Sequence, residues 1–452
     1  MRECVNVLVR LGIGECLNVV VFMKRTVVFL FFVFCLSSLF AEPADSTANK
    51  KWRFGFSGLV NPQFFVDTRQ VVSGREEMML FYPKPVERDA DGHDLNATPS
   101  LNMLAITARL ALTIEGPDVL GAKIKGYIEG DYTGASDASI NLFRLRHAYI
   151  DMRWRHHELL LGQFWYPMTV HEIMPATQPL NMGAPFHPYA RYTQMRYTMR
   201  YGRFEALAVA AFQLDNKSQG ANGASTTYLK HSLVPEFNLQ LRYHSDRLLA
   251  GVAYNLLVIK PRDYVTDSAG GKHKVDTRYV SHSFSAFMRY NWREWSLKAQ
   301  TILSDNLYEG CTLGGYYERY DMLTGKYDYR PFHFATLWID FGRTKGHWQP
   351  GIFIGGAYNT TGSKTHLASQ TVTGVYGRGY DIDWMYRVQP RIGYVTNFGL
   401  SFWFEIEHTF AAYRNTLGDP TPTAAHDACK VHNERFILGT VYVFKKQVGG
   451  SR

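Results

Sequence analysis

The sequence predicts an all-β fold, a transmembrane antiparallel β-barrel of about sixteen strands with short periplasmic turns and long extracellular loops. Three observations support this fold class. Polar and apolar residues alternate with period 2, connections alternate between tight and long, and aromatic residues cluster beside the tight turns. The polar faces carry charges of both signs and the apolar faces are broad and aromatic, which is typical of a wall between lipid and water.

The alternation is clearest between Ala122 and Tyr166. The polar face of the first strand there carries a regular series, namely Lys123, Lys125, Tyr127, Glu129 and Asp131. The return strand carries Arg144 and Arg146 on its polar face. Opposite charges on neighbouring strands contribute roughly 0.2–1 kcal/mol per pair, so we expect Glu129 and Asp131 to pair with these arginines.

Strand-like segments follow one another along the whole chain. In order they are 52–69, 100–115, 122–133, 142–154, 158–166, 193–201, 204–213, 234–244, 247–260, 278–291, 295–305, 332–342, 348–359, 380–396, 399–413 and 433–444. Most tight turns are a few residues long, whereas the long connections are 70–99, 167–192, 214–233, 261–277, 306–331, 360–379 and 414–432. Long loops at one rim are typical of bacterial outer-membrane barrels, and a barrel of this size encloses an aqueous channel.

The first residues predict export. Met23 is followed by Lys24 and Arg25, then by the apolar run Val27–Leu39, which is too short for a comfortable membrane span, and by Ala41, a small residue suited to cleavage. The alternative is a helical anchor that the mature protein keeps. The expected organisation is an upstream extension from a misassigned start (1–22), a signal peptide (23–41), a short periplasmic segment (42–51), the barrel (52–444) and a periplasmic C-terminal tail (445–452).

The end of the last strand indicates the final location. Gly439 followed by Tyr442 and Phe444 on one face resembles the signal that barrel-assembly machinery recognises. We therefore expect the cell outer membrane of a Gram-negative bacterium, with outer-membrane lipid and the assembly machinery as partners. The net charge of +9 would suit nucleic acid, but an exported chain without basic runs argues against that partner.

Cys311 and Cys429 are the cysteines that remain after the predicted cleavage. Both follow strands that run outward, so both are expected at the outer rim. An oxidising compartment favours a disulfide between them. The sequence leaves open whether the two residues meet.

Several pieces between Arg109 and Met168 are distinctive. They are Leu112-Thr-Ile-Glu-Gly-Pro-Asp, Gly121-Ala-Lys, Gly126-Tyr-Ile-Glu-Gly-Asp-Tyr, Phe143-Arg-Leu-Arg-His-Ala-Tyr and Leu160-Leu-Gly-Gln-Phe-Trp. This stretch resembles the DcaP-like outer-membrane porins, which are trimeric sixteen-stranded channels for small anions, and similar barrels of Bacteroidetes. The resemblance implies a homotrimer, a narrow lumen and a preference for carboxylate-bearing solutes.

Basic residues outnumber acidic ones on the predicted inner faces. The candidate pore-lining residues are Arg109, Lys123, Lys125, Arg144, Arg146, Arg196, Arg200, Lys298, Arg387 and Arg391. Near mid-depth, Arg109, Arg196, Lys298 and Arg387 lack obvious local carboxylates. A constricted pore lined by one sign of charge concentrates the opposite ion, so we expect mild selectivity for small anions.

Residues 167–192 follow the fifth strand, where many such barrels fold a segment into the lumen. The stretch contains Pro167, Pro175, Pro179, Gly183, Pro185 and Pro188. This density of proline favours a fixed shape, so we predict an inward constriction with Arg191 and His187 as candidate lining residues. The alternative is an ordinary surface loop.

The function expected from these patterns is a porin-like channel for passive or weakly selective uptake of small hydrophilic, anionic solutes. A structural or adhesin-type barrel without conductance is the alternative. An outer-membrane hydrolase is disfavoured, because Ser281 and His282 point to opposite faces and cannot form a dyad. The histidines show no metal-ligand spacing, so no metal, cofactor or catalytic residue is expected.

Overall fold

The computed structural model describes residues 52–178, 181–361, 370–414 and 426–448. The predicted upstream extension, signal peptide and short periplasmic segment lie outside the described residues. Within the described ranges, no helix is long and apolar enough to cross a membrane.

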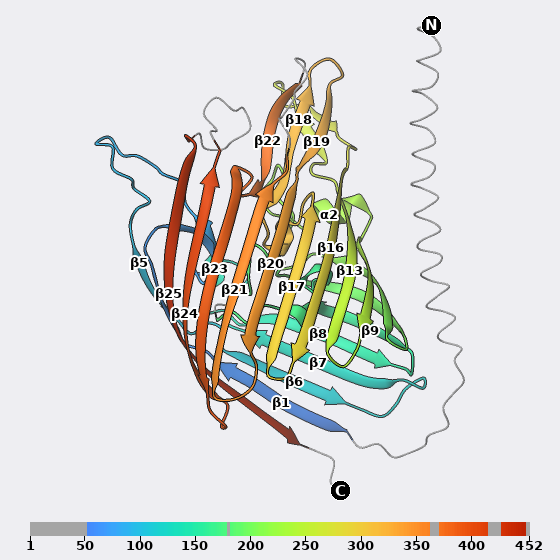
Figure 1. Cartoon of the computed structure of the whole chain (residues 1–452). Coiled ribbons are helices and arrows are strands. Elements are labelled where there is room, and N and C mark those ends of the chain that lie inside the picture. The colour runs from blue at the N-terminus through green and yellow to red at the C-terminus, as the bar shows by residue number, and fades with distance from the viewer. Residues whose placement is uncertain (1–51, 179–180, 362–369, 415–425, 449–452) are drawn as a thin grey trace.

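Sixteen antiparallel strands close into one barrel, which confirms the predicted fold class (Figure 1). Two of them are interrupted, the first as β1 (Arg53–Val60) and β2 (Gln63–Asp67), the second as β5 (Ser100–Leu104) and β6 (Arg109–Glu115). The others are β7 (Lys123–Asp131), β8 (Arg144–Arg153), β9 (His157–Trp165), β10 (Arg191–Tyr201), β11 (Phe204–Phe212), β12 (Glu236–His244), β13 (Leu248–Ile259), β16 (Tyr279–Trp292), β17 (Trp295–Ser304), β20 (Phe334–Arg343), β21 (Trp348–Asn359), β23 (Ile382–Val395), β24 (Leu400–Tyr413) and β25 (Cys429–Val448). Each wall strand overlaps a predicted segment.

The first and last strands close the barrel. β1 pairs with β6 on one side and with β25 on the other, and β2 pairs with β5 and β25. Pro62 lies in the break between β1 and β2, where its missing N–H removes a ladder hydrogen bond. Thr107 Oγ1 donates to the Asn61 carbonyl at 3.1 Å across the same break.

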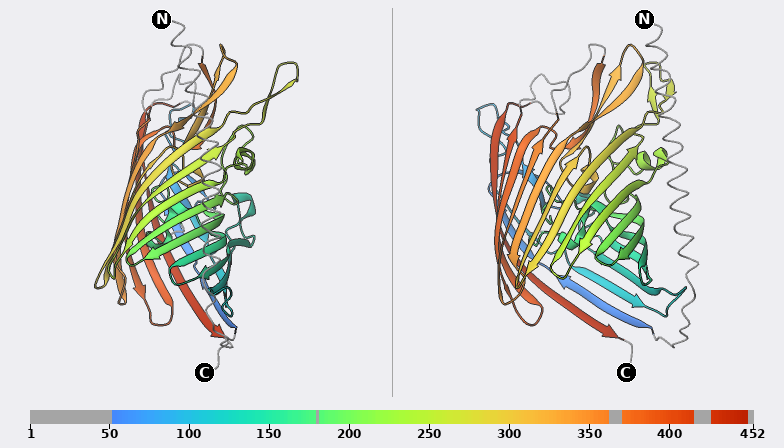
Figure 2. Two further views of the ribbon diagram at one scale, coloured as in Figure 1. Left: turned by 90° about the vertical axis from the view of Figure 1, so that its right-hand side faces the viewer. Right: turned by 45° about the vertical axis from the view of Figure 1, so that its right-hand side comes forward.

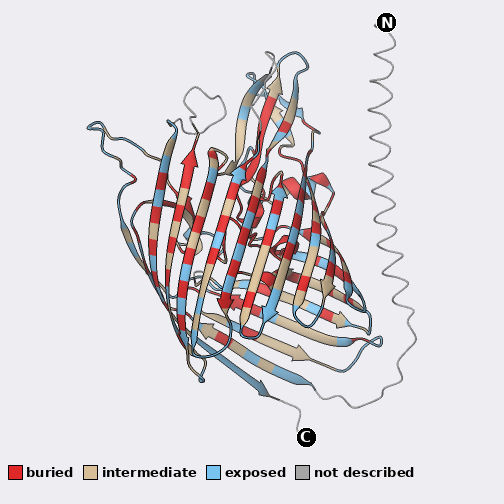
Figure 3. Ribbon diagram, viewed as in Figure 1, coloured by how far each residue is buried: buried red, intermediate tan, exposed pale blue. Residues whose placement is uncertain are grey.

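Burial alternates along the wall strands, as the sequence pattern predicts (Figure 3). In β16 the side chains of Ser281 and Ser283 are buried, whereas Val280 and Phe284 are exposed on the outer face. His282 lies on the outer face too, so it points away from Ser281 as expected. In this strand, apolar side chains therefore cover the face that would meet lipid, and polar ones face the interior.

The long loops contain elements that the sequence analysis treated as plain loop. They are β3 (Val71–Gly74), β4 (Met79–Pro83), β14 (Tyr264–Thr266), β15 (Lys272–Lys274), β18 (Gly314–Asp321), β19 (Lys326–Phe332), β22 (Gln370–Arg378), α2 (Thr227–Ser232) and the 3-10 turns η1 (Asp137–Ser139), η2 (Pro167–Thr169), η3 (His171–Ile173) and η4 (Tyr308–Gly310). β18, β19 and β22 form a sheet that extends beyond the barrel (Figure 2). Tyr316, Tyr329 and Tyr376 pack across these strands and explain why they pair.

β25 is longer than the predicted segment 433–444. Its last residues pair with β1, from Ser57 opposite Lys445 to Phe54 opposite Val448. The residues from Lys445 to Val448 therefore belong to the wall, and the predicted start of the C-terminal tail at residue 445 was wrong. The pairing continues because β1 begins far enough toward the tight-turn rim to offer partners.

Candidate functional site

Residues 167–178 and 181–190, here called the inward segment, cross the interior of the barrel. Lys298 Nζ on β17 donates to the Met174 carbonyl at 2.6 Å. Further along the segment, the Gln178 N–H donates to the Glu405 carboxylate on β24 at 3.2 Å. Further wall side chains that donate to its backbone are Gln240, to the Pro167 carbonyl, and Arg289, to the Glu172 carbonyl. The inward segment thus covers the inner face from β12 to β24.

The hairpin of β3 and β4, here called the inner hairpin, also packs against the inside of the wall. All of Met79–Pro83 is buried. The fully buried Arg387 on β23 donates to the carbonyls of Leu80 at 3.0 Å and Phe81 at 3.2 Å. The same guanidinium donates to the Ala184 carbonyl at 2.7 Å. One arginine therefore ties the inner hairpin and the inward segment to the wall.

A cavity of about 520 Å³ remains on the other side of the lumen, along β6 to β12. It is lined by Arg109, Lys125, Tyr127, Glu129, His147, Tyr149, Asp151, Arg153, Glu158, Leu160, Phe164, Trp165, His171, Glu172, Arg196, Thr198, Arg200, Glu205, Leu207 and Arg242. His171 and Glu172 come from the inward segment, and the other residues come from the wall. The lining combines charges of both signs with aromatic rings.

Most charges around the cavity are paired. Arg200 contacts Glu158 at 2.6 Å, and Arg242 contacts Glu172 at 2.8 Å. Further pairs are Arg109 with Glu129, Arg153 with Asp151, and Arg200 with Glu205. Burial alone would raise the pKa of the Glu172 carboxyl, but the charges of Arg242 and His171 outweigh it and lower that pKa to about 2. This carboxylate therefore stays ionised at neutral pH.

Lys125 and Arg196 line the cavity without a carboxylate oxygen within 4 Å among the described residues. Arg196 Nη2 donates to the Trp165 carbonyl at 3.2 Å, and its guanidinium lies 4.9 Å from the centre of the Phe164 ring. Lys125 Nζ lies 5.6 Å from the centre of the Tyr127 ring. Carbonyls and aromatic faces stabilise a cation without cancelling its charge. The lining contains six Lys or Arg and five Asp or Glu side chains, so it carries one positive charge in excess, and Lys125 and Arg196 are its cations without an ion pair in the described part of the chain.

The predicted pore-lining residues lie in different environments. Arg109, Lys125, Arg196 and Arg200 line the cavity. Lys123 lines a separate pocket of about 200 Å³ together with Arg53 and Glu115. The remaining candidates do not line the cavity: Arg144, Arg146, Lys298, Arg387 and Arg391. These side chains hold the wall and the inner segments together.

The expectation that Arg109 and Arg387 lack nearby carboxylates was wrong. Arg109 Nε lies 3.5 Å from Glu129 Oε1, and Arg387 Nε lies 2.9 Å from Glu407 Oε1. Each carboxylate belongs to the neighbouring strand in the barrel. The pairing register decides such contacts, and register was not part of the sequence prediction.

The predicted ladder between β7 and β8 is confirmed. Arg144 Nε donates to Asp131 Oδ1 at 2.8 Å, and Arg146 Nε donates to Glu129 Oε1 at 2.6 Å. Arg146 also contacts Asp131. These two arginines are therefore compensated, which makes their role structural.

The structure does not support His187 and Arg191 as lining residues. His187 is fully buried, and its Nδ1 is hydrogen-bonded to Gln300 Oε1 at 2.9 Å with its ring against Trp338. Arg191 is buried with its guanidinium 4.5 Å from the centre of the Trp165 ring. Neither residue lines the cavity, because both side chains are buried at the C-terminal end of the inward segment.

Cys311 and Cys429 are free thiols, so the predicted disulfide is not formed. Cys311 is buried, and its Sγ accepts a hydrogen bond from Asn216 Nδ2 at 3.2 Å. Cys429 begins β25 opposite Tyr413. The two cysteines therefore have separate local contacts and are not bonded to each other.

Sequence reasoning missed several acidic residues of the cavity. Glu158 and Glu205 each begin a run of inward-facing positions, and alternation counted back from Leu160 and Leu207 would have found them. Glu172 was not identifiable, because the path of the inward segment determines what it faces. Paired acids of this kind reduce the positive excess that the sequence suggested.

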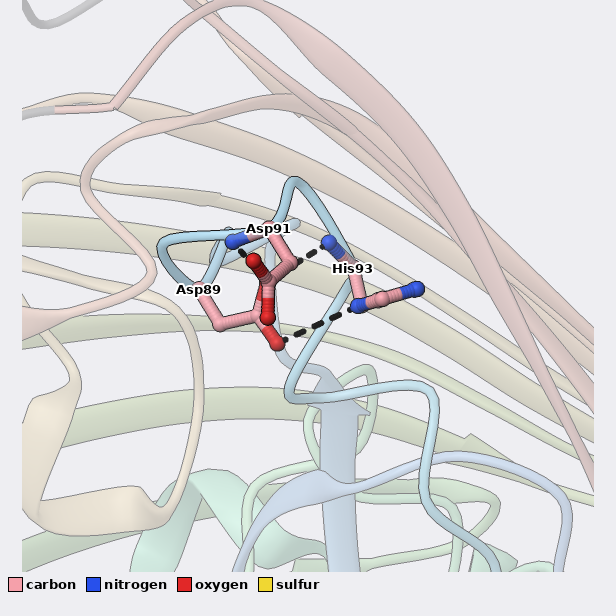
Figure 4. A group of neighbouring side chains, drawn as sticks. All are labelled: Asp89, Asp91 and His93. Atoms are coloured by element: carbon pink, nitrogen blue, oxygen red, sulfur yellow. Dashed lines mark hydrogen bonds and ion pairs between the residues drawn. The ribbon is translucent and has the colours of Figure 1, made fainter.

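Asp89, Asp91 and His93 form a compact group in the loop after the inner hairpin (Figure 4). Asp89 Oδ1 accepts the N–H groups of Asp91 at 2.9 Å and His93 at 2.8 Å. The backbone hydrogen bond from His93, joined by that from Asp91, holds the pKa of the Asp89 carboxyl below its usual value. The carboxylate is occupied in closing its own turn, which explains the group without a ligand.

Solved structures with the same architecture exist, although no family model and no curated protein matches the chain. The outer membrane channel DcaP of Acinetobacter baumannii is similar over 89% of this chain and 100% of that chain, with 14% identity and a TM-score of 0.59. The fold is that of an outer-membrane porin. An anion-selective porin from Comamonas acidovorans matches 87% of this chain and 100% of its own, with 10% identity and a TM-score of 0.51.

OmpT of Vibrio cholerae, in a trimer form, has the same coverage, 10% identity and a TM-score of 0.50. At such identities the likeness concerns the porin fold. The resemblance to DcaP-like porins therefore holds at the level of a porin-type barrel.

Proposed function

We propose that this protein is an outer-membrane channel for small hydrophilic anions. The observation that carries the proposal is the 520 Å³ cavity inside a closed barrel, where Lys125 and Arg196 form no ion pair within 4 Å among the described residues and the lining has one basic residue in excess. Uncompensated charge beside a low-dielectric wall raises the local concentration of the opposite ion. The porin fold supports transport rather than catalysis, and carboxylate-bearing solutes fit the sign of the charge.

The test is ion selectivity in planar bilayers. Under a KCl gradient, the reversal potential of the wild-type channel should have the sign of chloride preference. Lys125→Gln and Arg196→Gln should each move it toward zero, and the double variant further. Arg343→Gln is the matched control, because it removes one positive charge from an exposed pair with Glu294 near a tight turn. Cation preference of the wild type, or equal shifts in all variants, would contradict the proposal.

A structural or adhesin-type barrel is the second candidate. It is favoured by the inward segment and the inner hairpin, which bury Met79, Phe186, Trp338 and Phe353 in one apolar cluster inside the wall. If these segments closed the path completely, bilayers would show no current steps. Steady conductance would exclude this candidate.

The assembly that we propose is a homotrimer in the outer membrane of a Gram-negative cell. Support comes from the porin fold, from the trimer form of OmpT, and from the exposed apolar residues of the outer face, such as Phe56, Leu101 and Met103. Outer-membrane lipid would cover the rest of this face. The outward Tyr442 and Phe444 on β25 remain the candidate signal for the assembly machinery.

A further inference from the structure

A second polar group is buried near the long-loop end of the barrel, away from the cavity lining. Glu236 begins β12 and Glu309 lies in η4, and the two residues are only 3% and 4% exposed. The Tyr166 hydroxyl donates to Glu236 Oε1 at 2.7 Å. On the other side of this ring, a Cβ placed on Gly310 would lie 3.4 Å from Tyr166 Cε1. Tyr166 therefore contacts the Glu236 carboxyl directly and lies against the backbone next to Glu309, and the two carboxyl groups are close enough to interact electrostatically.

Several buried oxygen atoms of this group have no hydrogen-bond partner. They include one oxygen of each carboxyl group, Glu236 Oε2 and Glu309 Oε1, and the hydroxyl of Tyr192. The Tyr192 ring lies 4.7 Å from that of Tyr166. Ser283 Oγ is also unpartnered and stands opposite Asn255, whose Nδ2 donates to Glu236 at 2.7 Å. The site is therefore built of oxygen ligands.

Neither carboxylate has an ion pair among the described residues. The nearest candidate, Arg378, directs Nη1 to the carbonyls of Tyr308 and Thr312, at 3.2 Å each, instead of to Glu309. A buried carboxylate without a cation is costly, because the interior solvates the charge poorly. Either protons or a metal ion must therefore compensate this pair.

We propose that Glu236 and Glu309 bind a calcium ion that fixes η4 against the barrel wall. Calcium is a hard cation that takes carboxylate, hydroxyl and carbonyl oxygens in flexible arrangements. Magnesium demands near-octahedral geometry and keeps its waters, which suits a dry site formed by separate strands and a loop less well. The site is independent of the proposed anion selectivity, since neither carboxyl group lines the cavity.

The experiment uses the full-length protein in detergent, stripped with a chelator and titrated with terbium(III) as the calcium probe. Excitation of the nearby Tyr166 and Tyr192 should give sensitised terbium emission that calcium displaces. Glu309→Gln and Glu236→Gln should each weaken binding on the order of 100-fold, since each removes one charged ligand. Asp89→Asn is the control for the exposed acidic loop group and should leave the titration unchanged.

A second measurement on the wild type guards against misfolded variants. Calcium should raise the thermal unfolding midpoint more than magnesium does, and Glu309→Gln, a loop substitution, should abolish the difference. Absence of sensitised emission from the wild type would overturn the proposal. Emission that persists in both glutamine variants, or that disappears in Asp89→Asn, would overturn it as well.

Discussion

The ion pairs of the wall are of two kinds, those buried in the interior and those exposed to solvent. Arg435 and Asp67 are both fully buried and form two hydrogen bonds, Nε to Oδ1 at 2.9 Å and Nη2 to Oδ2 at 2.6 Å. Arg53 and Glu115 lie at the tight-turn end, with side chains 58% and 37% exposed. Solvent screens the second pair, whereas loss of one partner from the first leaves a buried charge.

Asp67→Asn should therefore lower the free energy of unfolding by about 3–5 kcal/mol, because Arg435 loses its counter-charge in the interior. Urea unfolding of the refolded barrel, followed by tryptophan fluorescence, measures the change. Glu115→Gln is the matched control and should cost at most about 1 kcal/mol. Equal effects of the two substitutions would contradict the distinction.

The sequence predicted which side chains face inward better than it predicted which of them meet. Alternation placed Arg196 and Lys125 on the inner face, and both line the cavity. It could not show that Glu407 compensates Arg387 on the neighbouring strand. A face follows from one strand alone, whereas a contact depends on register and on the path of distant segments.

At the scale of elements, the inward segment and the inner hairpin determine how much of the lumen stays open. Both are attached at Arg387, which donates to carbonyls of Leu80, Phe81 and Ala184. Neither segment is part of the barrel wall. Their position thus depends on a few buried polar contacts in addition to apolar packing.

Arg387→Met should release both segments from β23. We expect larger and noisier single-channel conductance than in the wild type, together with a loss of about 3–5 kcal/mol of stability because the buried Glu407 loses its ion-pair partner. Lys298→Met removes one carbonyl contact at Met174 and should have a smaller effect on conductance. Unchanged conductance in Arg387→Met would contradict this role.

The wall strands were predictable because lipid and water impose a period of 2 on their sequences. The strands β18, β19 and β22 were not, because they pair beyond the wall and are stabilised by tyrosines such as Tyr316 and Tyr376 that meet only in three dimensions. The proline-rich composition did suggest an ordered path for residues 167–192. It could not indicate that His187 would be buried against Gln300.

At the scale of the whole molecule, the apolar side chains on the outer face of the barrel need an apolar environment to cover them. Phe56, Leu101 and Met103 are among the exposed residues on the strands near the barrel seam. Lipid can cover them, and so can another copy of the chain.

Light scattering in mild detergent should give three copies of the chain per particle. The double substitution Leu101→Lys with Met103→Lys should shift the particles toward monomers, because it places charges in an apolar interface. A wild-type monomer would contradict the trimer.

The ladder between β25 and the pair β1 and β2 joins the two ends of the polypeptide. None of its hydrogen bonds can form before the final strand is available, so until then the first strand has unpaired N–H and C=O groups along one edge. Such an edge can pair with strands of other chains, and barrel closure is slow because the first and last strands are far apart in the sequence. The outer-membrane location that we propose therefore requires that the unclosed chain be escorted until its last strand completes the barrel.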